Sequence, residues 1–180
     1  MISNITLAVT GSISAYKAAD LTSRLMKEGY QVTVLMSKAA QAFITPLTLQ
    51  VLSKNTVHID IMAEDDVMKV NHIDLAKNTD LFLVAPASAN TIAHLSYGFA
   101  DNIITGVALA LPPEVRKMIA PAMNTKMYQN PITQENLSRL ATFGYREIKP
   151  KASLLACGDV GTGALADIDT IMAEITSLRD

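Results

Sequence analysis

The chain has 180 residues, of which 49% are hydrophobic and 18% charged, and its formal net charge is −2 at pH 7. This composition is that of a globular protein rather than a disordered one, and the length fits one domain with a sizeable core. The small negative charge gives no basis for binding nucleic acid or an anionic membrane surface. We therefore expect small molecules and further copies of the chain as partners.

The only cysteine, Cys157, rules out an intrachain disulfide and a CxxC metal site. The N-terminal residues have no basic start and no small-residue cleavage site. The apolar stretches are too short to span a bilayer. Together these features predict a cytoplasmic protein in a reducing compartment.

Strands and helices alternate along the chain. Apolar runs typical of buried strands cover residues 5–10, 32–36, 81–85 and 117–120. The spacing of apolar side chains and the breaks at glycine predict helices over residues 15–28, 132–143 and 168–178. Residues 55–70 are interpreted as a strand followed by a loop. This alternation predicts one doubly wound α/β domain over residues 1–180, with a Rossmann-like or flavodoxin-like parallel sheet and ligands beyond the carboxyl ends of its strands.

The first predicted strand leads into a polar segment, Gly11, Ser12, Ile13 and Ser14. Backbone N–H groups, hydroxyls and a helix N-terminus can together bind an anion, although an ordinary turn with Ser14 as N-cap fits the same pattern. The GxGxxG fingerprint is absent, and the second strand ends at Ser37 instead of the acidic residue that would hold a nicotinamide dinucleotide ribose. A phosphate-bearing mononucleotide therefore fits better than NAD.

Two later strands also end in polar segments. Ser88, Ala89, Asn90 and Thr91 would let a flat ring approach the backbone and would supply hydrogen bonds, but taken alone they fit a capped helix after a proline-terminated strand better. Asn124 follows the strand at 117–120, and its amide could hold a substrate carboxylate without adding a full charge. Asparagine is also frequent in turns.

Cys157 and His72 are the remaining candidates for chemistry. Cys157 precedes a glycine-rich segment that ends at Gly163, which suggests a flap carrying a thiol, although a lone cysteine is more often a small buried hydrophobe. His72 lies at a predicted loop-to-helix junction, where a general acid or base could be presented. His58 and His94 are expected to be structural or at the surface. No HxxxH or paired acidic pattern surrounds His72, so we expect no metal site.

Taken in this order along the chain, the segments resemble the homo-oligomeric flavin-containing cysteine decarboxylase family. The resemblance extends over nearly the whole sequence, and within the family it is closest to the members that act in coenzyme A biosynthesis. It implies FMN bound by Gly11, Ser12, Ile13, Ser37, Ser88, Ala89, Asn90, Thr91 and Ala122. It further implies His72 as the catalytic base, Asn124 as the carboxylate anchor, Met123 and Ala156 as substrate contacts, and Cys157 as the acid.

The reaction implied by this resemblance is the decarboxylation of 4'-phospho-N-pantothenoylcysteine to 4'-phosphopantetheine. A cysteinyl carboxylate has no electron sink, so oxidation of the CH₂–SH unit to a thioaldehyde is needed before CO₂ can leave to give an enethiolate. The resemblance also implies homotrimers, or multiples of trimers, with FMN and substrate at subunit contacts. Two positions depart from the family: Tyr128 stands where members often carry Trp, and Ala164 where their flaps often carry Arg.

Three other interpretations use the same fold. A peptidyl-cysteine decarboxylase of lantibiotic type would share the histidine and the Asn motif but would not need Cys157, so this cysteine favours the coenzyme A substrate. A non-catalytic regulatory subunit is disfavoured by the presence of His72, Asn124 and Cys157 together. A flavin prenyltransferase would be expected to differ at the histidine and Asn motifs.

Overall fold

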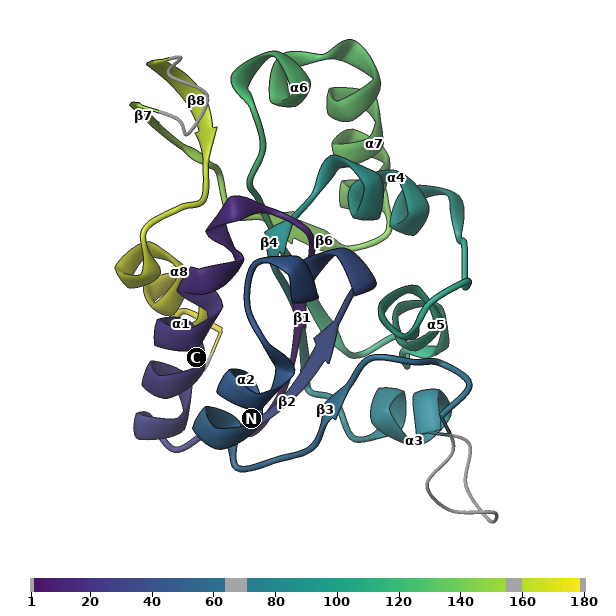
Figure 1. The fold of residues 1–180 in the computed structure, drawn as a ribbon. Helices are drawn as coiled ribbons and strands as arrows, with labels where there is room; N and C mark the ends of the chain where they lie inside the picture. Colours follow the sequence, from purple (N-terminus) through teal and green to yellow (C-terminus); the bar gives the residue numbers. More distant parts are fainter. Residues whose placement is uncertain (1, 64–70, 155–159, 179–180) are drawn as a thin grey trace.

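A six-stranded parallel sheet forms the centre of the computed structural model, which describes residues 2–63, 71–154 and 160–178 (Figure 1). Its strands are β1 (Asn4–Val9), β2 (Gln31–Met36), β3 (Val57–His58), β4 (Leu81–Ala87), β5 (Arg116–Pro121) and β6 (Tyr145–Glu147). They lie in the order β3-β2-β1-β4-β5-β6, the 3-2-1-4-5-6 order of Rossmann-type sheets. The predicted doubly wound α/β fold is therefore confirmed. The order reverses between β1 and β4, which is where such sheets bind ligands.

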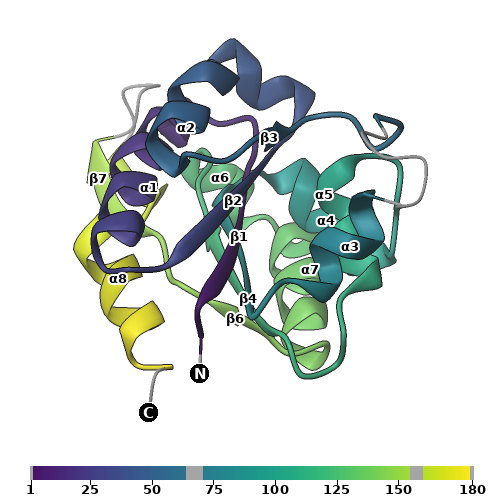
Figure 2. The same ribbon diagram turned by 90° about the horizontal axis from the view of Figure 1, so that it is seen from below.

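Helices cover both faces of the sheet (Figure 2). One face carries η1 (Ile13–Tyr16), α1 (Lys17–Lys27), η2 (Lys38–Ala42), α2 (Pro46–Ser53) and α8 (Ile168–Thr176). The other face carries α3 (Asn71–Lys77), α4 (Ala89–Tyr97), α5 (Ile103–Ala110) and α7 (Pro131–Thr142). The short helix α6 (Thr125–Gln129) follows β5, and a separate antiparallel hairpin consists of β7 (Lys151–Leu154) and β8 (Val160–Ala164).

The strands are apolar throughout because both of their faces are buried. In β1, Leu7 and Val9 pack in the cluster under α1 and α8, whereas Ala8 between them packs in the cluster under α4 and α5. All three side chains are fully buried. Alternation of side chains along a strand thus divides one continuous apolar run between two cores, as expected for a parallel sheet covered on both sides.

Strand β4 is longer than predicted. The proline at position 86 was expected to end the strand at residue 85, but β4 continues to Ala87, which pairs with Pro121 of β5. The ladder shifts register between Val84 and Ala87. Pro86 lacks an N–H group, but its carbonyl oxygen accepts hydrogen bonds from the backbone and the hydroxyl of Thr10, at 3.3 and 2.7 Å. The strand therefore ends two residues later than expected, directly before Ser88.

Other boundaries differ locally. The predicted helix 15–28 begins as the 3₁₀ helix η1, and Ser12, rather than Ser14, is its N-cap. In the region 55–70, β3 comprises only two residues, and residues 64–70 lie outside the described part. Among the described residues, no helix has the length and apolar content needed to cross a membrane.

Candidate functional site

A cavity of about 580 Å³ lies beyond the carboxyl ends of β1, β4 and β5, next to the point where the strand order reverses. Its volume is typical of a small-molecule site. Three strand-end segments and the β7–β8 hairpin form its wall: Gly11, Ser12, Ile13, Ser14, Tyr16 and Lys17 after β1, Ser88 and Ala89 after β4, Ala122, Met123, Asn124 and Met127 after β5, Lys151, Ser153, Gly163 and Ala164 from the hairpin, and Phe43.

The segment after β1 is tightly packed against the segment after β2. A Cβ atom at Gly11 would lie only 2.6 Å from the Cβ of Ala39, so only glycine fits at position 11 with this backbone. The Ser12 hydroxyl accepts a hydrogen bond from the Ser14 N–H at 3.3 Å. Ser37 caps η2 by accepting from the Ala40 N–H at 3.1 Å, and it does not line the cavity. Gly11, Ser12 and Ile13 therefore line the cavity, whereas Ser37 does not.

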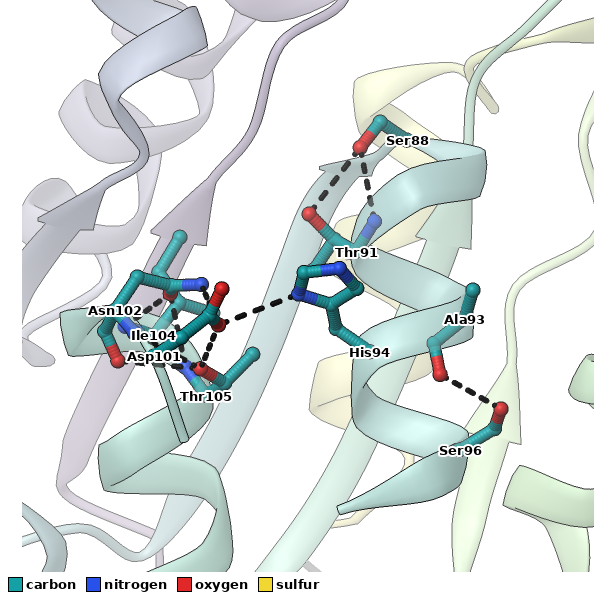
Figure 3. Close-up of polar contacts among 9 residues, drawn as sticks. All are labelled: Ser88, Thr91, Ala93, His94, Ser96, Asp101, Asn102, Ile104 and Thr105. Carbon is teal, nitrogen blue, oxygen red and sulfur yellow. Dashed lines mark hydrogen bonds and ion pairs between the residues drawn. The ribbon is translucent and has the colours of Figure 1, made fainter. Parts of the chain in front are cut away.

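The segments after β1 and β4 are joined through Thr10. Its hydroxyl donates to the Pro86 carbonyl at 2.7 Å and accepts from the Ser88 N–H at 2.8 Å. Ser88 is the N-cap of α4, where its side chain accepts from the Thr91 N–H and donates to the Thr91 hydroxyl, both at 3.2 Å (Figure 3). Ser88 and Ala89 line the cavity, whereas exposed Asn90 and buried Thr91 do not.

The segment after β5 carries Asn124 and supports the hairpin. Asn124 is the N-cap of α6, and its Oδ1 accepts a hydrogen bond from the Lys126 N–H at 2.8 Å, which fixes the orientation of its amide. The Met123 N–H donates to the Gly163 carbonyl at 2.9 Å. A Cβ atom at Gly163 would lie 2.3 Å from the Met123 carbonyl oxygen. Strand β8 therefore lies directly against the backbone beside Asn124.

His72 lies away from this cavity. It is the second residue of α3, which packs on α5 on the sheet face opposite α1. A Cβ atom at Gly106 of α5 would be 4.0 Å from its Cδ2. The His72 Nδ1 atom is buried and has no hydrogen-bond partner in the part of the chain that the structure describes. The loop-to-helix position predicted for His72 is present, but within one chain His72 does not join Asn124 and Gly11.

His94 connects α4 to the start of α5. Its Nδ1 lies 3.3 Å from an Asp101 carboxylate oxygen (Figure 3). The His94 ring stacks on Phe99 with 4.8 Å between the ring centroids. Partial desolvation raises the pKa of Asp101, but hydrogen bonds from its own backbone and from His94 lower it, and its pKa lies below the ordinary value. Asn102 then caps α5 by accepting from the N–H groups of Ile104 and Thr105. This network fixes α5 relative to α4.

Several wall residues were not predicted from the sequence. Lys17 lies three residues after Ser14, and its position at a helix start beside an anion site was a usable signal. Phe43 and Lys151 had no such signal because their positions depend on tertiary packing. Cys157 and Ala156 lie outside the described residues. Within those residues, no group of three or more His, Cys, Asp or Glu side chains could hold a metal ion.

Comparisons of the sequence with known proteins identify its relatives. The profile of the family described as Flavoprotein matches residues 2–180. A probable phosphopantothenoylcysteine decarboxylase of Streptococcus mutans is 67% identical over 175 residues, which are 97% of this chain and 98% of the relative. The coenzyme A biosynthesis bifunctional protein CoaBC of Bacillus subtilis is 43% identical over 169 residues, but the match covers 94% of this chain and only 41% of that protein.

Solved structures agree with this grouping. A PPC decarboxylase mutant complexed with pantothenoylaminoethenethiol superimposes with a TM-score of 0.87 at 29% identity, covering 99% of this chain and 98% of that one. The FMN-binding protein AtHal3 gives a TM-score of 0.84 at 30% identity, with 99% and 97% covered. The chain belongs to the flavoprotein family and groups within it with the phosphopantothenoylcysteine decarboxylases, which are carboxy-lyases.

Proposed function

We propose that this protein is an FMN-dependent decarboxylase that converts 4'-phospho-N-pantothenoylcysteine to 4'-phosphopantetheine in coenzyme A biosynthesis. The observation that carries the proposal is the cavity at the β1/β4 reversal point, whose wall combines the Gly11–Ser14 segment with Asn124. The 67% identity to the Streptococcus mutans relative supports the substrate assignment.

The residues of the cavity fit FMN. The backbone at Gly11 is open to the cavity and carries no side chain, because a side chain there would clash with Ala39. The hydroxyls of Ser12 and Ser14 lie on the same wall. These groups suit the phosphate of the mononucleotide. The small side chains of Ala89 and Ala122 suit a flat ring system. Ile13 and Ser88 complete the proposed contacts with FMN. Ser37, Asn90 and Thr91 do not line the cavity, and we propose that they border the bound cofactor.

The chain's own residues would orient the substrate and control protons. Bound FMN would supply the two-electron oxidation of the cysteinyl CH₂–SH unit, and it would return those electrons once the loss of CO₂ has given the enethiolate. Asn124, whose oxygen is held by the α6 cap, would bind the carboxylate through its amide nitrogen, with Met123 and Ala156 beside the substrate. His72 would take up a proton during the oxidation. Cys157 would then protonate the enethiolate carbon.

The position of His72 supports a homo-oligomer. His72 is not among the residues that line the cavity of its own chain, so we propose that His72 enters the cavity of a neighbouring copy in a trimer or a multiple of trimers. The His72→Asn and Asn124→Asp variants, each inactive alone, should regain part of the activity when mixed after dissociation and reassembly. A monomeric protein in sedimentation, or mixtures without any recovery, would contradict this arrangement.

The activity is tested by incubating the purified protein with 4'-phospho-N-pantothenoylcysteine and measuring CO₂ and 4'-phosphopantetheine. We expect the yellow absorbance of bound FMN and full turnover. Cys157→Ser should release CO₂ but accumulate the enethiol with the flavin left reduced, and His72→Asn should bind FMN without releasing CO₂. Release of CO₂ from a peptide with a C-terminal cysteine, but not from the phosphopantothenoyl compound, would favour the peptidyl-cysteine alternative instead.

A further inference from the structure

The charges on the cavity wall are all of one sign. Among the described residues that line it, Lys17 and Lys151 are charged, and no acidic side chain is present. The other lining residues are glycine, serine, asparagine and apolar side chains. The wall therefore places two positive charges at a small-molecule site in a protein whose net charge is −2.

The two lysines come from different elements. Lys17 is the first residue of α1, and Lys151 is the first residue of β7 in the hairpin, which stands above α8 in the view of Figure 1. Lys151 pairs across the hairpin with Ala164, which also lines the cavity and carries no charge. The cation on this part of the hairpin is therefore supplied by β7 and not by β8.

Asp167 holds Lys151 in place. Its carboxylate forms an ion pair with the Lys151 Nζ, and although Asp167 is the N-cap residue of α8, its side chain makes no capping hydrogen bond. The hydrogen bond from Lys151, and to a lesser extent the charge of Lys17, lower the pKa of Asp167. Asp167 itself does not line the cavity. It thus positions one lysine without adding negative charge to the wall.

We propose that Lys17 and Lys151 together bind the phosphate monoester of the substrate. The inference rests on the proposed function, in which the Gly11–Ser14 segment takes the cofactor phosphate and Asn124 takes the cysteinyl carboxylate. The second phosphate dianion then needs its own cations, and ammonium groups are common partners of phosphate in proteins. The two lysines make the site selective for phosphorylated over unphosphorylated N-pantothenoylcysteine.

The test compares these two substrates in Lys17→Met and Lys151→Met holoenzymes. Losing a hydrogen bond to a charged group should raise KM for the phosphorylated substrate about tenfold or more. KM for the unphosphorylated substrate should stay near the wild-type value. Asp167→Asn is the matched variant, because it breaks the same ion pair but keeps both ammonium groups, and it should lose less of the preference for phosphate than Lys151→Met does. Lys149→Met, which removes a lysine outside the cavity wall, should keep the preference.

Two results would overturn the proposal. One is an equal rise of KM for both substrates. The other is a loss of affinity for FMN that is not shared by riboflavin, because this would assign the lysines to the cofactor phosphate. Calorimetric binding of 4'-phosphopantetheine and pantetheine separates this inference from the proposed function. If the wild type does not decarboxylate, the function fails, but tighter binding of the phosphorylated compound that the Lys→Met variants lose would still support the lysine site.

Discussion

Gly11 and Ala39 approach so closely that a Cβ atom at Gly11 would lie 2.6 Å from the Cβ of Ala39. The contact joins the turn after β1 to η2, which follows β2, at the edge of the sheet where the cavity opens. It also explains why glycine is required at this position, since even the smallest side chain would push the two segments apart.

Gly11→Ala should therefore weaken FMN binding and lower stability. The added methyl group overpacks the contact with Ala39, and overpacking of this kind costs about 1–3 kcal/mol. Fluorescence titration with FMN and urea unfolding of the apoprotein measure the two effects. Adding Ala39→Gly to the variant removes the clash and should restore both values. Wild-type FMN affinity in Gly11→Ala would show that this turn does not shape the cofactor site.

The hairpin should be equally sensitive at Gly163. A Cβ atom there meets the Met123 carbonyl oxygen at 2.3 Å, and a backbone atom cannot move aside without shifting the segment that carries Asn124. Gly163→Ala should raise KM strongly while leaving FMN affinity nearly unchanged, as measured by steady-state kinetics and FMN titration.

Gly161 provides the control for this prediction. The three atoms nearest to a Cβ atom at Gly161 would all belong to the side chain of Thr125, with its hydroxyl at 2.6 Å. Gly161→Ala should therefore be rescued by Thr125→Ala, whereas Gly163→Ala should not. Rescue of both variants would place the constraint in the side chain rather than in the backbone contact.

The sheet and its ligand edge could be predicted because the apolar runs of β1, β2, β4 and β5 are local features of the sequence. Gly11, Ser12, Ser88 and Asn124 could be placed at one edge for the same reason, since parallel strands end together. Their convergence on one cavity is shown by the structure, whereas their roles toward FMN and substrate remain predictions.

What the sequence could not indicate depends on packing between distant segments. Helix α5 is apolar on nearly every side and contains Gly106, so it has no amphipathic stripe that would reveal it. Lys151 lies at the cavity because the β7–β8 pairing sets it opposite Ala164, which also lines the cavity. The placement of His72 on the opposite face follows from the packing of α3 on α5, which no local pattern encodes.

Removing the cap of α5 should affect catalysis through His72. Asn102 accepts from the N–H groups of Ile104 and Thr105 at 3.0 and 3.1 Å, so Asn102→Ala should lower the free energy of unfolding by about 1 kcal/mol. Because α5 supports α3, kcat should also fall severalfold with FMN affinity retained. Thr45→Ala removes the cap of α2 and should cost a similar amount without changing kcat. Equal kcat values in the two variants would show that α5 does not determine the position of His72.

At alkaline pH, stability should decline because of Tyr145 and Tyr128. Burial raises the pKa of Tyr145, and burial together with the hydrogen bond to Glu147 raises that of Tyr128. Above about pH 10, the ordinary tyrosine value, the unfolded chain loses these protons while the folded protein keeps them. The unfolded state then binds fewer protons, so the free energy of unfolding falls as pH rises, and the full contribution is present only below pH 10 or so.

Phenylalanine variants separate the two tyrosines in urea unfolding at pH 8 and at about pH 10.5, just above the ordinary tyrosine pKa. Tyr145→Phe should reduce the loss of stability between the two pH values. Tyr128→Phe should also reduce it, but it should in addition lower stability at pH 8 by about 1 kcal/mol, because its hydroxyl donates to the Glu147 carboxylate at 2.8 Å. An unchanged pH dependence in both variants would mean that neither phenol is held protonated by the fold.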